Sequence, residues 1–395
     1  LDLNDLSVEN GKVVLRKQMA DGSRNQVELA LNKINIAKVG QDLEGALNLD
    51  AGINVLQKAV DGEETNLSLS LKLDGDLGLN ADLLPKNSTV TGQIKVENAT
   101  GAYSDMVGVT GALSLAIQPG NLENVSLNMT RNGQSAGNIQ VKGPLDLATT
   151  EGRMVASFEN LNRQFLNLAG AIAGIDFKET VLDGSLTMTL TNGGNLLALD
   201  AKVSGANVSL SVGDQVTPPL NLEVDTVLNY DGDGEKVVIQ QFGLSVADGL
   251  VPSITGKLAQ PITFDWSGRS DSFQEPEFNL NIAKFDLGKW REFTANTVQA
   301  GELFGDLNLK VQQSGARMQA VYKGGLQGTD VQWDGHDEKG TSAALDLNVV
   351  VEDYTRLILN RAEAEWNNAA GNSLATVSSS GSYALGSNGY NIQSD

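Results

Sequence analysis

The sequence predicts an all-β protein with a few short helices, in which a long, curved antiparallel sheet built from internal repeats leaves an open apolar groove. Aliphatic and polar residues alternate in many segments, as in 184–190 (GSLTMTL) and 305–311 (GDLNLKV). A period of two is typical of strands with one apolar face. Asn-Gly and Asp-Gly pairs at 10–11, 132–133 and 183–184 predict tight turns, which favour antiparallel pairing.

The same alternation predicts further strands along the chain. Two segments, 158–176 and 285–304, have a different pattern, because apolar residues such as Leu161, Phe165 and Leu168 recur there at helical spacing. We therefore expect two short helices in an otherwise β chain. The predicted strands include 46–55, 67–73, 113–117, 125–129, 220–224 and 345–349.

Each predicted helix is followed by a strand that begins with glycine, and this recurrence indicates an internal repeat. Aligning Leu161 with Leu287 brings Leu220 close to Leu345 at nearly the same offset. The interpretation is one continuous structure rather than independent domains. Its parts are an N-terminal segment with a weak first repeat and two repeats of helix plus meander, over 1–160, 161–286 and 287–395.

Two predicted helices cannot cover the apolar side of so many strands. Aromatic residues make up only 5% of the chain, whereas sandwich cores are usually filled with large rings. An aliphatic groove for an acyl ligand fits this composition, and a sandwich packed with Leu and Val is the alternative. The predicted groove-lining residues are Leu113, Leu115, Ile117, Leu186, Met188, Leu190, Leu220, Leu222, Val224, Leu307, Leu309, Val311, Leu345, Leu347 and Val349.

The composition argues against several other classes of function. A net charge of −21 disfavours nucleic acid, and it also predicts that the chain does not lie flat on an anionic membrane. Cysteine is absent, and the single histidine, His336, is expected in a polar loop. The segment 229–234 (NYDGDG) resembles the start of a calcium loop, but Gln240 replaces the usual Glu at position twelve, so a hairpin turn is expected. No catalytic residue, metal or cofactor is predicted.

Several segments are similar to the periplasmic part of AsmA-like proteins, a family that includes TamB-type and YhdP-type members. The similar segments are LDLNDLSVENGKVVLRKQ, VELALNKINI, GALNLDAGINV and FDLGKW with GELFGDLNLKV. The resemblance implies a curved sheet with a lipid-lining groove and movement of phospholipid between the inner and outer membranes of Gram-negative bacteria.

From this resemblance we expect a non-enzymatic lipid-transfer module that supports outer-membrane lipid homeostasis or biogenesis. It would be periplasmic and attached to the inner membrane through a segment outside this chain. Its partners would be phospholipid or another acyl lipid and membrane proteins at the groove ends. The alternative function is a β-sandwich repeat that serves as an adhesin or structural spacer of the bacterial surface.

Overall fold

The computed structural model describes residues 3–18, 22–39, 44–58, 62–80, 82, 84–173, 175–212, 215–267, 276–294, 296–312, 317–333, 336–353 and 355–384. Strands make up 79% of this part and helices 6%, so the all-β prediction is confirmed. Within it, 21 strands belong to one long antiparallel sheet that is not closed into a barrel. The chain divides into two compact units, 1–197 and 198–395, and each is described by itself.

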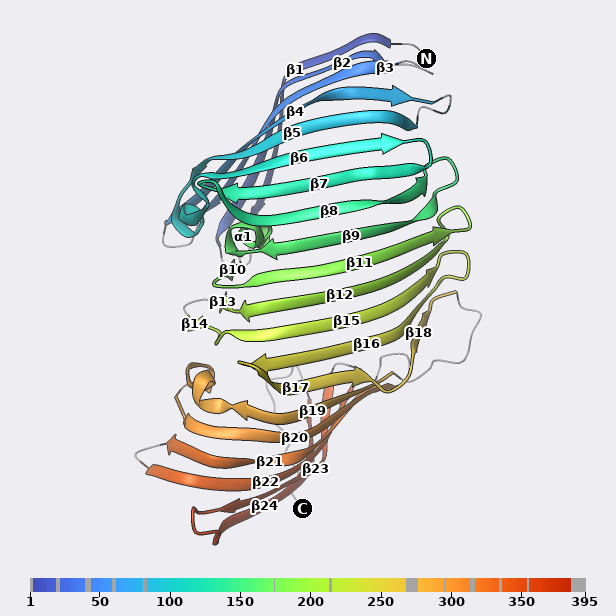
Figure 1. The fold of residues 1–395 in the computed structure, drawn as a ribbon. Helices are drawn as coiled ribbons and strands as arrows, with labels where there is room; N and C mark the ends of the chain where they lie inside the picture. Colours follow the sequence, from blue (N-terminus) through green and yellow to red (C-terminus); the bar gives the residue numbers. More distant parts are fainter. Residues whose placement is uncertain are drawn as a thin grey trace. The chain divides into compact units, whose positions relative to one another are not determined.

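Unit 1 is an antiparallel meander in which each strand of the sheet pairs with the next one along the chain (Figure 1). The 3₁₀ helix η1 (Gly101–Met106) connects β5 to β6, and α1 (Arg163–Ala173) with the short β10 (Asp176–Phe177) connects β9 to β11. The strands are β1 (Leu3–Gln18), β2 (Arg24–Val39), β3 (Glu44–Lys58), β4 (Glu64–Leu79), β5 (Pro85–Ala99), β6 (Val109–Gln118), β7 (Asn121–Arg131), β8 (Gln134–Asp146), β9 (Glu151–Leu161) and β11 (Val181–Thr191).

Unit 2 begins within β12 (Leu196–Val208) and is also a meander. The two halves of β16 pair with different strands, β18 and β17, and η2 (Leu287–Thr294) connects β19 to β20. Its strands are β13 (Leu210–Val212), β14 (Gln215–Val216), β15 (Leu220–Asp231), β16 (Lys236–Asp248), β17 (Val251–Leu258), β18 (Ile262–Asp265), β19 (Glu277–Asp286), β20 (Val298–Gln312), β21 (Arg317–Trp333), β22 (His336–Glu352), β23 (Arg356–Asn367) and β24 (Ser373–Ala384).

The predicted turns agree with the structure only in part. Asn132 and Gly133, with φ of 51° and 82°, form the turn between β7 and β8, as expected of an Asn-Gly hairpin. The pairs at 10–11 and 183–184 were predicted as turns but lie inside β1 and β11. Asn10 keeps a positive φ of 58° there, so the Asn-Gly signal marks a local irregularity of a strand rather than its end.

Both predicted helices are shorter than their sequence spacing indicates. Residues 158–161 belong to β9, where Leu161 pairs with Leu182, and the α-helix covers only Arg163–Ala173. In the segment 285–304, only Leu287–Thr294 is helical, as a 3₁₀ helix. The ends of both segments join the sheet, because cross-strand hydrogen bonds satisfy their backbone groups more completely than a frayed helix end would.

The helices that do form lie at one end of the strands of their unit. Among the described residues, no helix is long and apolar enough to cross a membrane. In unit 1, η1 and α1 lie at the same end of the meander (Figure 1). Unit 1 also holds the main buried cluster, which includes Leu67, Met106, Val109 and Met129 at 0–1% exposure. This cluster positions the candidate site described next.

Candidate functional site: an apolar face and its cap

The strand register of unit 1 collects the alternating aliphatic residues on one face of the sheet. Residues directly opposite each other in antiparallel strands share a face, so a row of side chains can be followed from strand to strand. Two neighbouring rows are apolar in all ten strands from β1 to β9 and in β11. They are Val8, Ile34, Leu49, Leu73, Gly92, Leu113, Leu127, Ile139, Phe158, Gly184 and Leu6, Ile36, Leu47, Gly75, Val90, Leu115, Val125, Val141, Ala156, Leu186.

The opposite face of the same strands is polar. Hydrogen bonds connect side chains across this face, for example from Asn48 Nδ2 to Asp74 Oδ1 at 2.5 Å and from Gln140 Nε2 to Asn124 Oδ1 at 3.1 Å. One row from β3 to β11 is made of Asn48, Asp74, Thr91, Ser114, Ser126, Gln140, Ser157 and Ser185. The sheet of unit 1 therefore separates an aliphatic face from a hydrogen-bonded polar face.

Unit 2 repeats this separation of faces, with more aromatic residues among the aliphatic ones. Phe242 and Phe278 contribute rings whose centroids are 5.7 Å apart. One row of the apolar face contains Val224, Leu244, Gly256, Leu280, Leu307, Tyr322, Leu347 and Ala362. On β24 this row ends at Ser379.

All fifteen predicted groove residues lie in strands, and within each unit they lie on the apolar face. The six from Leu113 to Leu190 belong to unit 1 and the nine from Leu220 to Val349 belong to unit 2. None of them is fully buried: fourteen are half-buried, and Leu309 is 36% exposed. Core positions of a two-layer sandwich are normally fully buried, whereas these side chains are only partly enclosed.

One margin of the unit 1 face is covered by η1 and α1, which we call the cap. Tyr103 and Met106 of η1 are 5% and 1% exposed, and Phe165 and Leu168 of α1 pack against the same buried cluster. The sequence reasoning found α1 but missed η1. The signal for η1 was a pair of glycines, Gly101 and Gly108, which adopt φ of 62° and 84° on either side of a segment that contains Tyr103 and Met106.

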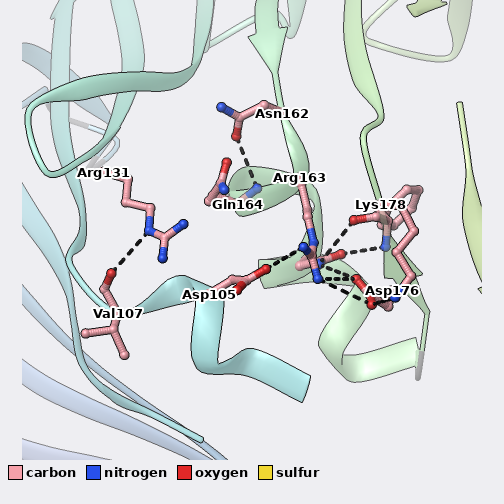
Figure 2. A network of polar contacts seen from close by, with 10 residues as sticks. Asp105, Val107, Arg131, Asn162, Arg163, Gln164, Asp176 and Lys178 are labelled. Carbon is pink, nitrogen blue, oxygen red and sulfur yellow. Dashed lines mark hydrogen bonds and ion pairs between the residues drawn. The ribbon is translucent and has the colours of Figure 1, made fainter. Parts of the chain in front are cut away.

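An ion-pair network connects the parts of the cap (Figure 2). Arg163 at the start of α1 reaches Asp105 of η1 through Nη1 at 2.5 Å and Asp176 of β10 through Nη2 at 3.3 Å. Asn162 accepts a hydrogen bond from the backbone N–H of Gln164 at 3.1 Å, which satisfies a free donor in the first turn of α1. Because Arg163 is shared by two acidic partners, the network fixes α1 against η1.

Asp176 has the most extensively bonded carboxylate of this network. Desolvation acts to raise its pKa, but hydrogen bonds from Lys178 and Asn167 and the charge of Arg163 together hold the pKa below its ordinary value of 3.8. Asn167 Nδ2 donates to Asp176 Oδ1 at 2.8 Å, and Asn167 Oδ1 accepts from the backbone N–H of Phe177 at 2.8 Å. The network is built to keep this carboxylate ionised, and it is a structural element of the cap.

Two hollows of the surface are bordered mainly by residues of the polar faces. One of about 580 Å³ in unit 2 is bordered by Lys257, Asn279, Asn308 and Lys323, and by Leu307 alone of the predicted groove residues. Another of about 620 Å³ in unit 1 is bordered by residues such as Lys142 and Arg153. Asn308 already donates to Asn279 Oδ1 at 2.7 Å, so neighbouring side chains use part of the bonding capacity of the first hollow.

The other candidates for chemistry have structural roles. His336 was expected in a loop, but it is the first residue of β22 and pairs with Trp333, because β21 and β22 continue into the predicted loop. In 229–234, the Asp231 carboxylate accepts from the N–H of Gly234 at 2.8 Å and pairs with Lys236 at 3.3 Å across the β15–β16 turn. Among the residues that the structure describes, no group of three or more His, Cys, Asp or Glu could hold a metal ion.

Comparisons with protein-family models, with curated protein sequences and with solved structures found no match to this chain. What can be inferred about its function therefore comes from the apolar face, its cap and the chemistry that such a surface performs.

Proposed function

We propose that this protein is a non-enzymatic lipid-binding module that holds the acyl chains of phospholipids along its apolar faces. The observation that carries the proposal is the pair of aliphatic rows across ten strands of unit 1, whose side chains are mostly half-buried. A contiguous apolar surface of this extent is unusual on a monomeric soluble protein and is typical of a binding surface.

The chemistry of the face selects an acyl chain over other ligands. The two rows contain no hydrogen-bonding side chain, so they offer nothing to a sugar, a nucleotide or a peptide backbone. Protein interfaces are usually anchored by Trp, Tyr and Arg, whereas these rows contain one aromatic residue, Phe158. Each methylene group that leaves water for this surface contributes roughly 0.8 kcal/mol, which makes a long alkyl chain the ligand of best fit.

Differences in exposure support a groove rather than a flat surface. Ala46 and Ala112 on the polar side of unit 1 are exposed, although their side chains are small. Leu47 and Leu113, next to them in sequence and on the apolar side, are half-buried. Side chains crowd together on the inner side of a curved sheet and spread apart on the outer side, so this contrast favours curvature toward the apolar face.

The same units carry the proposed internal repeat. In unit 1 the connection from β9 to β11 contains α1, and in unit 2 the connection from β19 to β20 contains η2. Each connection leads into a strand of the sheet with an aliphatic face. This correspondence supports a repeat of helix plus meander, with boundaries near 161 and 287.

The resemblance of the sequence to AsmA-like proteins supports a location of this activity in the periplasm of a Gram-negative bacterium. There the module would support outer-membrane lipid homeostasis, with attachment to the inner membrane through a segment outside this chain and membrane proteins at the groove ends. A net charge of −21 is consistent with a module that stands between membranes rather than lying flat on an anionic surface. No energy source is part of the proposal, so transfer would be passive or driven by partners.

The test is extraction of the natively purified protein with organic solvent, followed by lipid mass spectrometry. We expect phospholipid at a defined ratio to protein, and uptake of a fluorescent fatty acid by the delipidated, still folded protein. A folded protein that contains no lipid and takes up no fatty acid would contradict the proposal and favour the adhesin or spacer. A variant with a truncated aliphatic residue on the polar face, Val155→Ala, serves as the control that should bind like the wild type.

A further inference from the structure

On β6 and β7 the unit 1 face is buried at the cap margin and only half-buried toward the other end of the strands. On β6, Val109 is 0% exposed beside the cap, whereas Leu113, Leu115 and Ile117 farther along the strand are half-buried. On β7, Met129 is 1% exposed at the cap end. The neighbouring strand β8 follows the same trend, with Ala136 at 1% beside the cap, whereas on β5 both Ala99 beside the cap and Val90 farther away are buried, at 6% and 3%.

The cap is packed directly on the sheet, without space for a ligand beneath it. A Cβ atom added at Gly137 would lie 2.8 Å from Leu161 Cδ2 and 3.2 Å from the ring of Phe165, so the helix side chain rests on the strand backbone. A Cβ atom at Gly111 would collide with the sulfur of Met129. The Arg163–Asp105 ion pair at 2.5 Å holds α1 and η1 together above this contact.

The opposite margin of the unit 1 face is formed by polar turns. The β6–β7, β8–β9 and β11–β12 connections, at 119–120, 147–150 and 192–195, lie at this end. Asp146 caps its own turn by accepting from the N–H of Ala148 at 2.9 Å, and Glu151 accepts from the N–H of Gly193 at 3.2 Å. This margin therefore places polar and charged groups beside the open end of an aliphatic surface.

We propose that the cap is an end stop for acyl tails, so that a bound phospholipid lies along the strands with its tail ends against the cap and its headgroup at the polar turns. This inference rests on the proposed lipid-binding function and specifies the orientation of the ligand. Leu127 and Phe165, which are half-buried beside the cap cluster, are the residues that meet the tail ends.

The dimensions of the face fit this orientation. From Gly111, beneath the cap, to Ile117, at the open end of β6, the strand advances by six residues, or about 20 Å. One leaflet of a bilayer contains acyl chains that fill about 15 Å, half of the roughly 30 Å hydrocarbon core. An extended tail therefore fits between the cap and the polar turns, and Phe165 becomes a determinant of the preferred chain length.

The first experiment uses the wild-type protein and two photoreactive phosphatidylethanolamines, one with a diazirine at the end of an acyl chain and one with it on the headgroup. After irradiation, peptide mapping should place the tail label at Leu127 and Phe165, and the headgroup label at residues 118–121 and 146–151. The reverse pattern, or the same distribution for both labels, would overturn the orientation and leave lipid binding intact. Absence of both labels from the folded protein would overturn the proposed function together with this inference.

The second experiment measures chain-length preference in mixtures of phosphatidylethanolamines that differ only in acyl length, by native mass spectrometry. Phe165→Ala should shift the preference to longer chains, by about fourfold in relative occupancy for each further methylene accommodated. Leu113→Trp adds volume on the open face and should shift the chain-length preference to shorter chains. This second variant keeps the test decisive if Phe165→Ala destabilises the cap. Val155→Ala should leave the preference unchanged. Identical preferences in all four proteins would overturn the end stop.

Discussion

Two single substitutions in unit 1, each of a methionine by aspartate, distinguish an open apolar face from a packed core. Met188 is half-buried on the apolar face, where it pairs with Met154 on β9, and Met129 is 1% exposed under the cap. Burial of a whole Met side chain contributes roughly 1.5–3 kcal/mol, so Met188→Asp should cost about 1 kcal/mol. In a unit of this size that lowers the Tm by about 2–4 °C.

Met129→Asp should behave differently, because it removes a fully buried side chain and places a carboxylate beside Met106 and Val109. Loss of the buried Met alone costs about 2–5 kcal/mol, and the unpaired charge adds several more. We expect a fall in Tm of more than about 10 °C, or loss of unit 1. The assay is differential scanning calorimetry together with phospholipid occupancy by mass spectrometry.

We expect Met188→Asp to lose its phospholipid while the Tm of its delipidated form stays close to that of the delipidated wild type. The comparison between delipidated proteins is needed because a bound lipid itself raises the Tm. A collapse of Met188→Asp similar to that of Met129→Asp would refute the open face and favour a closed sandwich. Full lipid occupancy in a stable Met188→Asp protein would refute the position of the ligand.

Three further predictions concern charge and titration. Because the pKa of Asp176 is held below 3.8, the ionised carboxylate stabilises the fold above that pH, and this stabilisation is lost as the pH falls through the lowered pKa. Asp176→Asn should therefore have a lower Tm than the wild type at neutral pH, and the two Tm values should converge in acid. Burial raises the pKa of Tyr103 to about 12, so the fold keeps its full stability below pH 10 and loses stability as the pH rises from 10 toward about 12. Absorbance titration of Tyr103→Phe should lack one late-titrating phenol. With its charge of −21, the protein should not float with anionic vesicles at low salt, and strong flotation would contradict the orientation of the module between membranes.

The all-β class was predictable because alternation is a local signal. In a half-buried strand the side chains point to opposite sides in turn, so segments such as 113–117 and 345–349 show their strand character without knowledge of any partner. The fifteen groove residues could be chosen from the sequence for the same reason. The limits of 158–176 and 285–304 could not, because hydrogen bonds to neighbouring strands decided where helix gives way to sheet.

By itself, the sequence determined that each strand has an aliphatic and a polar side, since that property belongs to single residues and their order. Only the tertiary structure decided that Leu113, Leu127 and Ile139 fall in one row, because register depends on turns and irregularities that shift one strand against the next. The cap was likewise a tertiary result. Arg163 and Asp105 are distant in the sequence, and only the return of the meander over β6 to β9 brings them within 2.5 Å of each other, so that one margin of the face is closed.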